Sequence, residues 1–437
     1  MYDFSHIGHA RTYIIFDCFA KYLKFSGYKV FYLQNITDVD DKIIAKAREK
    51  GVAPADLARA FEENHLKDMA QLGVTSVKEY ARATDYIPQI ISQVERLMEK
   101  GYGYKLDDGI YFDISKFKGY GKLSHRTSLQ AEDSVSRIDH SNLKKNRGDF
   151  CLWKFNAGVE GEPSWPSPFG AGRPGWHIED TAITEAFFGP QYDIHGGARD
   201  LIFPHHEAEI TQMEAISGKE PLAKYWMHTG FLNFDGQKMS KSLGNGVTIG
   251  DFLKRYSTQH LRFWIAKNLW RSPVDYSEST MAEVKNALEK IEEFLRKLKT
   301  VKKTAKSDKK VRGLVKKARE SFYKELADDF NTPRAFAVLF ELIKGVNKFL
   351  DVNRVNKKDA QDTYAFFGEI NKIFNIIDFK HAQKSTTPDE VKKLVSMREE
   401  FRTLKNWQKS DEMRQEIEKY GYTVQDTPDG PVIKKIT

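Results

Sequence analysis

The sequence of 437 residues has only two cysteines, Cys18 and Cys151, and no Cys-x-x-Cys pair. So few cysteines exclude a disulfide framework, and the missing pair excludes a common type of zinc or redox motif. No apolar run approaches the ~18 residues of a membrane-spanning helix. The first residues have neither the basic nor the apolar segment of a signal peptide. We therefore expect a soluble, cytoplasmic protein without a membrane partner.

Excess charge of one sign is confined to the last third of the chain. The whole sequence has a net charge of +8. Residues 281–437 hold 34 Lys and Arg against 25 Asp and Glu, a net of +9, whereas residues 1–280 have a net of −1. A neutral front and a basic back are typical of an enzyme body joined to a segment that binds a polyanion, although lysine-rich helices also occur without a ligand.

The first 235 residues alternate between helical and strand patterns. We predict helices over 10–26, 41–50, 55–72, 86–100, 181–188 and 205–216. We predict strands over 29–33, 109–114 and 227–232, and one that ends near 194–195. This alternation favours a parallel α/β sheet, which the polar and Gly/Pro-rich residues 101–170 would interrupt as an insertion. From the predicted N-cap Thr248 the pattern is helical to about Phe379, and a helical hairpin with a short strand ending follows from Thr386.

The first motif that carries chemistry is Ser5-His6-Ile7-Gly8-His9, directly before the first predicted helix. A helix N-terminus attracts phosphate through its unpaired N–H groups and its dipole. Gly8 has no side chain to keep a nucleotide from the backbone. His6 and His9, three residues apart, can donate to one phosphate. Two histidines near a helix start are often structural, so this motif alone does not decide the function.

The second motif is Lys238-Met239-Ser240-Lys241-Ser242. Lys238 and Lys241 can reach one polyphosphate and neutralise the charge that develops on its leaving group. A lone loop of this kind is usually a solvated surface. Its combination with His-Ile-Gly-His about 230 residues upstream is far more specific, and it is the signature of class I aminoacyl-tRNA synthetases.

Five further segments resemble cysteinyl-tRNA synthetase: Ile36–Lys42, Gly172–Glu179, Asp193–Gly197, Phe203–Glu207 and Asp328–Pro333. The resemblance extends over essentially the whole chain. It implies a Rossmann-type class I catalytic domain split by an insertion, then an all-α anticodon-binding bundle and a small C-terminal unit. We place the two Rossmann halves at 1–100 and 171–235, the insertion at 101–170, the stem-contact region with the KMSKS loop at 236–300, the bundle at 301–385 and the last unit at 386–437.

The resemblance also implies the reaction and the residues that perform it. L-Cysteine would be activated by ATP with Mg²⁺, releasing pyrophosphate, and then transferred to tRNA(Cys) by a monomeric enzyme. Trp176 and His195 would line the amino-acid pocket. The catalytic residues would be His6, His9, Lys238 and Lys241, and ATP would be bound by His6, Gly8, His9 and Lys241.

Two departures from the family pattern concern its zinc site. The family has a Cys-Gly-Pro-Thr-Val strand before the Tyr-Asp with which this sequence begins, and without that interior strand we expect two exposed sheet edges. A gene start placed too late or a shortened chain would explain the difference, with a genuine short form as the alternative. The family's second cysteine is replaced by Asp180. The metal ligands that remain are Asp180, His205 and Glu209, a harder set that should bind zinc weakly, bind another metal, or bind none.

Two other groups of residues offer weaker metal sites. Cys151 could supply a substitute thiolate, but we expect it to be packed as a small apolar residue. Asp38, Asp40 and Asp41 could suggest a magnesium site, but such clusters more often cap a helix start.

Two alternative functions stay open beside cysteine–tRNA ligation. One is a ligase that joins cysteine to a small amino sugar, as in mycothiol synthesis. The segment Asp329–Pro333 and the basic C-terminal unit favour tRNA over this acceptor. The other is a tRNA-binding paralogue with an impaired amino-acid pocket, against which the intact histidine and lysine motifs weigh.

Overall fold

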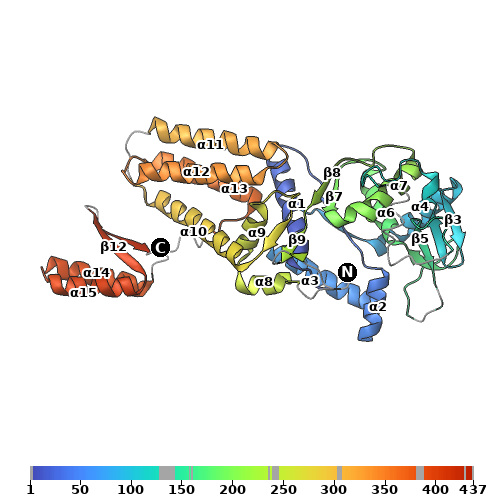
Figure 1. The fold of residues 1–437 in the computed structure, drawn as a ribbon, viewed down its shortest axis with the longest axis horizontal. Helices are drawn as coiled ribbons and strands as arrows, with labels where there is room; N and C mark the ends of the chain where they lie inside the picture. The colour runs from blue at the N-terminus through green and yellow to red at the C-terminus, as the bar shows by residue number, and fades with distance from the viewer. Residues whose placement is uncertain are drawn as a thin grey trace. The chain divides into compact units, whose positions relative to one another are not determined.

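The computed structural model describes residues 3–126, 143–156, 158, 161–234, 237–238, 246–302, 308–379, 388–427 and 430–435 (Figure 1). The chain divides into two compact units, Met1–Ile377 and Asp378–Thr437. No helix of the described ranges is both long and apolar enough to cross a membrane.

Two parallel strand pairs form the sheet framework of the first unit. β1 (Leu33–Ile36) pairs with β2 (Glu79–Arg82), and β7 (Tyr192–Ala198) pairs with β8 (Ala223–Thr229). Among the described residues each of these four strands has a single ladder partner.

The predicted helices of this α/β region are confirmed. They are α1 (Ile7–Phe25), α2 (Asp41–Lys50), α3 (Pro54–Gln71), α4 (Ile87–Glu99), α6 (Trp176–Phe188) and α7 (Glu207–Ser217). Short helical turns precede or follow them: η1 (Ala83–Tyr86), η2 (Ile114–Lys116), η3 (Arg199–Leu201) and the π-helical turn η4 (Ile202–His206). Helix α6 begins five residues before the predicted start at Thr181, because Gly175 is its N-cap.

Three strand predictions need correction. The strand expected at 29–33 begins only at Leu33, because its ladder partner β2 begins at Glu79. The strand expected to end near 194–195 continues to Ala198, along β8. The strand expected at 227–232 is two strands, β8 and β9 (Leu232–Phe234), in different sheets. Gly230 separates them, where an added Cβ would lie 2.4 Å from the carbonyl oxygen of Ser272.

The region between α4 and α6 forms an antiparallel sheet. Its order is β3 (Gly103–Leu106), β4 (Gly109–Phe112), β5 (Phe150–Phe155) and β6 (Gly172–Pro174). The core between this sheet and helices α4 and α6 contains Ile90, Leu97, Phe112, Trp153 and Ile178. Burying such side chains contributes about 1.5–3 kcal/mol each. The sheet therefore fixes where α6 begins, and α6 carries Trp176 and Asp180.

Helices follow the α/β region to Phe374. They are α8 (Ile249–Arg255), α9 (Thr258–Ala266), α10 (Glu278–Thr300), α11 (Lys309–Ala327), α12 (Thr332–Leu350) and α13 (Lys357–Phe374). A small sheet has the strand order β10 (Gln237–Lys238), β9 and β11 (Val274–Tyr276). Its strands β9 and β10 come before α8 in the chain, and β11 lies between α9 and α10. Figure 1 shows α10 to α13 packed side by side as a bundle. Thr248 caps α8 as predicted, accepting a hydrogen bond from the backbone N–H of Asp251.

A buried arginine ties this bundle to the first helix. Arg262 on α9 is fully buried and donates to Asp17 on α1 at 2.7 Å. It also donates to the carbonyl oxygens of Leu72 at 2.9 Å and Phe374 at 2.6 Å. A buried charge pair with its remaining donors satisfied is costly to break from one side. The helix that begins with the histidine motif is therefore held firmly against α9 and the end of α13.

The second unit is a helical hairpin followed by a β-hairpin. Helices α14 (Asp389–Thr403) and α15 (Trp407–Lys419) precede β12 (Tyr422–Thr427) and β13 (Gly430–Lys435), which are antiparallel. Its small core includes Val391, Val395, Ile417, Tyr422 and Val424. Arg398, almost fully buried, donates to Asp426 and joins the helices to the strands.

Candidate functional site

The two motif histidines stand together at the start of α1. His6 is the N-cap residue, and its ring stacks on that of His9 with centroids 3.8 Å apart. The backbone N–H of His6 donates to Nδ1 of His9 at 3.2 Å. A Cβ added at Gly8 would lie 2.8 Å from the His6 ring, so a larger residue would displace it. The arrangement presents two imidazoles where a helix N-terminus favours phosphate.

The lysine motif can be located only through its flanks. Lys241 lies outside the described residues, and of Lys238 the structure describes the backbone, in β10. After the motif, Val247 accepts a hydrogen bond from the backbone N–H of Ile7 at 3.0 Å, and Ile249 donates to the carbonyl oxygen of Ser5 at 3.0 Å. The segment that follows the lysine motif is therefore paired directly with the histidine motif.

The three expected metal ligands do converge. Asp180 on α6, His205 on η4 and Glu209 on α7 have donor atoms within 4.8 Å of one another, and all three are buried. Nε2 of His205 lies 2.7 Å from Oδ2 of Asp180 and 3.2 Å from Oε1 of Glu209. On its other side, Nδ1 of His205 contacts Nδ1 of His177 at 2.9 Å. The side-chain amide of Asn35, on β1, donates to Oδ1 of Asp180.

A second group of side chains that could hold a metal ion shares Glu209. It adds His195 from β7 and His206 from η4, again within 4.8 Å of one another. Nε2 of His195 lies 3.4 Å from Glu209, and Nε2 of His206 lies 4.0 Å from it. The outer nitrogens are held: Nδ1 of His195 pairs with the hydroxyl of Tyr192 at 2.6 Å, and Nδ1 of His206 pairs with Nε2 of His228 at 2.8 Å.

Burial sets the protonation of these groups. It raises the pKa of Glu209 well above its usual value, and the Asp180 charge adds to the shift. It lowers the pKa of His195 and of His228 to about 4, and lowers the pKa of His206 well below 6.5. The imidazoles are therefore neutral near pH 7. Both oxygens of the fully buried Glu209 lack a hydrogen bond. The imidazoles of His195 and His206 and the buried carboxyl of Glu209 form a group that could hold a cation.

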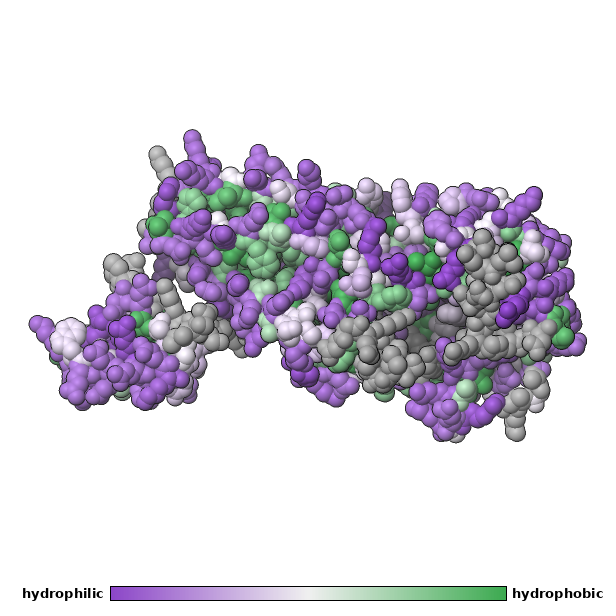
Figure 2. Space-filling view, in the orientation of Figure 1, coloured by the Kyte–Doolittle hydropathy of each residue, from purple (hydrophilic) through white to green (hydrophobic). Residues whose placement is uncertain are grey.

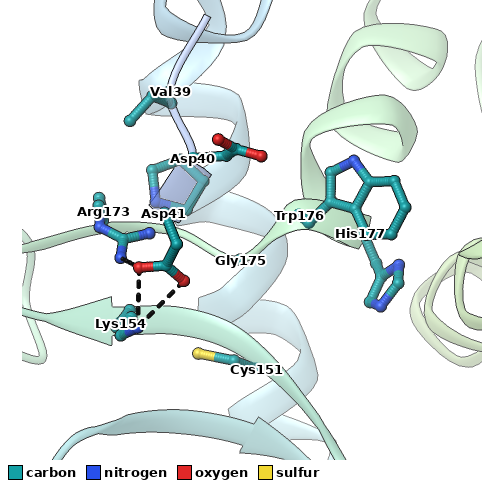
Figure 3. A pocket seen from close by; sticks show the side chains of 10 residues that line it. Val39, Asp40, Asp41, Cys151, Lys154, Arg173, Gly175, Trp176 and His177 are labelled. Atoms are coloured by element: carbon teal, nitrogen blue, oxygen red, sulfur yellow. Dashed lines mark hydrogen bonds and ion pairs between the residues drawn. The ribbon is translucent and has the colours of Figure 1, made fainter. Parts of the chain in front are cut away.

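A pocket lies beside the start of α6 (Figure 3). Trp176 lines it, and its ring also stacks on that of His205 with centroids 4.2 Å apart. Asp41 forms the opposite wall, paired with Arg173 and, at 3.0 Å, with Lys154. Of the two residues expected in the amino-acid pocket, Trp176 lines this pocket and contacts His205, and His195 contacts Glu209.

Cys151 is a packed residue, as expected. It is 3% exposed on β5 and contacts Tyr104 and Tyr111 in a small apolar cluster. It also lines the pocket (Figure 3). The groups of metal-binding side chains found in the described part of the chain do not include it.

The aspartates after β1 serve the fold. Asp40 is the N-cap of α2 and accepts a hydrogen bond from the backbone N–H of Ile43 at 2.8 Å, which confirms the capping interpretation. Asp38 accepts from the backbone N–H of Thr84 at 3.0 Å. Within the described ranges, neither these two residues nor Asp41 belongs to a group of metal-binding side chains.

The roles of His206, Trp226 and His228 were not predicted from the sequence. His206 stands within the motif Phe203–Glu207, but nothing in the sequence separated it from its neighbour His205. Trp226 and His228 alternate along β8 and so point to one face, and both rings contact the His206 ring. The alternation of Trp226 and His228 along the strand was the sequence signal that could have placed them on one face.

The chain matches known families over most of its length. The profile described as tRNA synthetases class I (C) catalytic domain matches residues 1–286, and the DALR domain profile matches residues 321–378. The chain is 44% identical to a cysteine–tRNA ligase of Methanococcus maripaludis, over 100% of this chain and 93% of that relative. It is 45% identical to a cysteine–tRNA ligase of Thermoplasma volcanium, over 98% and 91%.

The solved structure of a methionyl-tRNA synthetase from Mycobacterium tuberculosis, bound by methionyl-adenylate, has a similar fold. It superimposes with a TM-score of 0.63 at 15% identity, covering 85% of this chain and 90% of that one. At that identity the likeness is one of fold.

Proposed function

The chain belongs to the cysteine–tRNA ligases, and from this membership we propose how its own residues carry out the reaction. It is a class I aminoacyl-tRNA synthetase that activates cysteine with ATP and transfers it to tRNA. The predicted fold class is confirmed, with a class I catalytic region and an all-α DALR region. The match extends through the DALR region, so neither the amino-sugar ligase nor the impaired paralogue is favoured.

The histidine motif and the lysine motif together form the ATP site in this proposal. The observation that carries it is the pairing of residues 247–249 with residues 5–7. His6 and His9 would donate to the phosphates at the N-terminus of α1, with Gly8 leaving the backbone accessible. Lys241 and Lys238 would neutralise charge on the departing pyrophosphate, and Mg²⁺ would accompany ATP. Catalysis would come mainly from positioning and charge stabilisation.

The residues present fit a divalent cation beside the amino-acid pocket. Imidazole and carboxylate donors converge there, and the buried oxygens of Glu209 accept no hydrogen bond. Asp180, His205 and Glu209 would hold the ion, which would act as a Lewis acid toward the thiol of the substrate. Trp176 would bound the pocket on one side and His195 would approach from the other. Because thiolates are absent from these positions, we expect weaker zinc binding and weaker rejection of serine than a thiolate site gives.

The basic third of the chain is the proposed tRNA surface. Lys309 and Lys310 begin helix α11, and both are exposed. In the second unit, Trp407 is 59% exposed at the start of α15, near the exposed Lys405 and Lys409. An exposed aromatic ring beside cations is suited to stack on unpaired bases. The face of this unit that Figure 2 shows is mostly hydrophilic, consistent with contact to a solvated polyanion. We further propose a cytoplasmic monomer.

ATP–pyrophosphate exchange with purified protein tests the ATP-site assignment. Exchange should depend on L-cysteine, and Gly8→Ala should reduce it because the added methyl displaces His6. Gly250→Ala, in the first turn of α8 where an added Cβ meets no closer atom than 4.0 Å, is the matched control. Equal exchange by both variants would contradict this site.

A further inference from the structure

A second buried arginine lies on helix α1, just after the histidine motif. Arg11 is 1% exposed, and in the part of the chain that the structure describes no carboxylate pairs with it. Burial lowers the pKa of Arg11 to about 10, which leaves the side chain charged at pH 7. A charge taken out of water is costly unless its hydrogen bonds are satisfied. The partners of its donor atoms therefore indicate what this residue holds in place.

Those partners are four backbone carbonyl oxygens from two distant segments. Nη1 of Arg11 donates to Phe231 at 2.6 Å, directly before strand β9. Nη2 contacts the loop 269–272, which precedes strand β11, through the carbonyl oxygens of Leu269 and Trp270, both at 3.2 Å, and of Ser272. One side chain of α1 thus holds the starts of two strands of the small sheet.

Strand β9 connects this contact to the lysine motif. It is the central strand of the sheet and pairs with β10, where Asn233 lies opposite Lys238, the first residue of the motif. The same face of α1 packs on β9 (Figure 1), since a Cβ added at Gly8, three residues before Arg11, would lie 4.0 Å from Cβ of Leu232. Fixing the start of β9 therefore also fixes the strand on which the motif begins.

We propose that Arg11 is a positioning residue for the lysine motif. The chain that leaves the motif is attached to α1 by the hydrogen bond from Ile7 to Val247. The chain that enters the motif is attached to the same helix by the hydrogen bond from Arg11 to Phe231. Both flanks are thereby set against the helix that carries the histidine motif, which is the alignment that phosphate chemistry between the two motifs requires. The inference rests on the proposed function, in which Lys241 acts on ATP.

The acceptors of Arg11 are themselves held in place. The backbone N–H of Gly230 donates to the carbonyl oxygen of Trp270 at 2.9 Å, and a Cβ added at Gly230 would lie 2.4 Å from the carbonyl oxygen of Ser272. On the other side of the loop, the indole N–H of Trp270 donates to the carbonyl oxygen of Asp329 at 3.0 Å. Acceptors fixed from both sides define one position for the guanidinium, and hence for α1 against β9.

Exchanging the guanidinium for an ammonium tests this role. Arg11→Lys keeps a positive charge, but a compact ammonium cannot reach acceptors spread over two segments as a planar guanidinium does. The kcat of cysteine-dependent ATP–pyrophosphate exchange should fall about 10- to 100-fold, because the lysine motif is displaced from the histidine motif. The KM for L-cysteine should change by less than about threefold, since Trp176 is on α6, away from these contacts.

A double-mutant cycle separates positioning from a general effect on the fold. A residue that acts through Lys241 has little left to lose once that lysine is removed. In the Lys241→Ala background, single-turnover adenylation should therefore fall less than about threefold when Arg11→Lys is added. Equal losses in the two backgrounds would overturn the inference, because damage to the fold does not depend on Lys241.

Arg262→Lys is the matched control. Arg262 is as deeply buried, at 0% exposed, but it contacts Asp17 and the end of α13, away from the small sheet. Measured well below its unfolding temperature, this variant should keep kcat within about threefold of the wild type. A loss as large as that of Arg11→Lys, with the same dependence on Lys241, would also overturn the inference.

A second variant covers the case in which Arg11→Lys does not fold. Gly230→Ala disturbs the same contact from the opposite wall, where the added methyl meets the backbone of Ser272. It should show the same loss and the same dependence on Lys241, and equal losses in the two backgrounds would contradict the inference. Wild-type exchange is measured first. Without dependence on cysteine the proposed function fails, and this inference with it, whereas cysteine-dependent exchange with equal losses overturns only the role of Arg11.

Discussion

Oδ2 of Asp180 and Nε2 of His205 lie 2.7 Å apart in the interior of the catalytic region. Asp180 thus gives His205 a hydrogen-bonding partner at the position where the family pattern has a thiolate ligand. A metal ion bound by both side chains would have to replace this hydrogen bond.

Replacing Asp180 with cysteine should favour metal binding by His205 over its hydrogen bond to residue 180. Asp180→Cys removes the hydrogen-bonding carboxylate and adds a thiolate donor, so zinc affinity should rise about tenfold or more. The preference for cysteine over serine should rise with it, as a chemical contact is added to shape selection of about 1–3 kcal/mol. Zinc competition and pyrophosphate exchange with each amino acid measure the two effects. Asp180→Asn is the control, since it removes the charge without adding a thiolate; an equal gain in that variant would contradict the explanation.

Removing the ammonium of Lys241 should slow adenylate formation more than it weakens ATP binding. The charge it would neutralise develops in the transition state, so we expect a loss of about 10²–10³ in rate with a smaller change in ATP affinity. Single-turnover adenylation and ATP titration separate the two effects. Lys254→Ala is a matched control, because Lys254 is an exposed lysine on the neighbouring α8, paired with Asp251. Wild-type adenylation by Lys241→Ala would remove this loop from the mechanism.

Neutralising lysines in the basic third should weaken tRNA binding and make it less sensitive to salt. The variant replaces Lys302, Lys303, Lys309 and Lys310 with alanine; Lys303 lies outside the described residues. For every phosphate that the protein no longer neutralises, the slope of log affinity against log salt should become shallower by about 0.7–0.9. Cysteine adenylation without tRNA should be unchanged. Identical tRNA affinity across a salt series would exclude these lysines from the RNA surface.

The buried pair of Asp17 and Arg262 should dominate the acid stability of the first unit. Burial alone would raise the pKa of Asp17, but Arg262 and Lys21 outweigh it and hold that pKa below its usual value. The stabilisation is thus complete above the unfolded pKa of about 3.9 and is lost as pH falls through the lower folded value. Asp17→Asn should therefore flatten the fall of unfolding free energy below about pH 4, as measured by urea titration.

Removing only the arginine of this pair measures how much the pair contributes to the unfolding free energy. Arg262→Met leaves Asp17 buried without its guanidinium and should cost about 3–5 kcal/mol in unfolding free energy. Arg96→Met is the control, because its pair with Glu185 is partly exposed and should cost no more than about 1 kcal/mol. Equal losses in the two variants would mean that Arg262 does not hold α1 against the bundle.

The features that the sequence predicts well are local ones. Helix α2 and its cap Asp40 have the predicted ends, because an N-cap aspartate, the apolar period and Gly51 all act within one helix. The prediction of a strand at 29–33 was wrong in its bounds, because the start of β1 depends on β2, more than forty residues later. The expected set Asp180, His205 and Glu209 came from a family pattern and does converge.

The set of His195, His206 and Glu209 could not be predicted in the same way. Its members come from β7, η4 and α7, and its supporting partner His228 comes from β8. No spacing in the sequence brings those elements together. Only the pairing of β7 with β8, and the packing of η4 against α7, place three imidazoles beside one buried carboxyl, those of His195, His205 and His206.

Charging of tRNA(Cys) by the purified full chain is the most direct test of the account. The protein, supplied with ATP, Mg²⁺ and zinc, is incubated with L-cysteine and a tRNA(Cys) transcript, and the esterified 3′ end is quantified. We expect cysteinyl-tRNA to form at a rate that falls when Gly8→Ala or Lys241→Ala is introduced. No charging, with pyrophosphate exchange that does not respond to cysteine, would contradict the account.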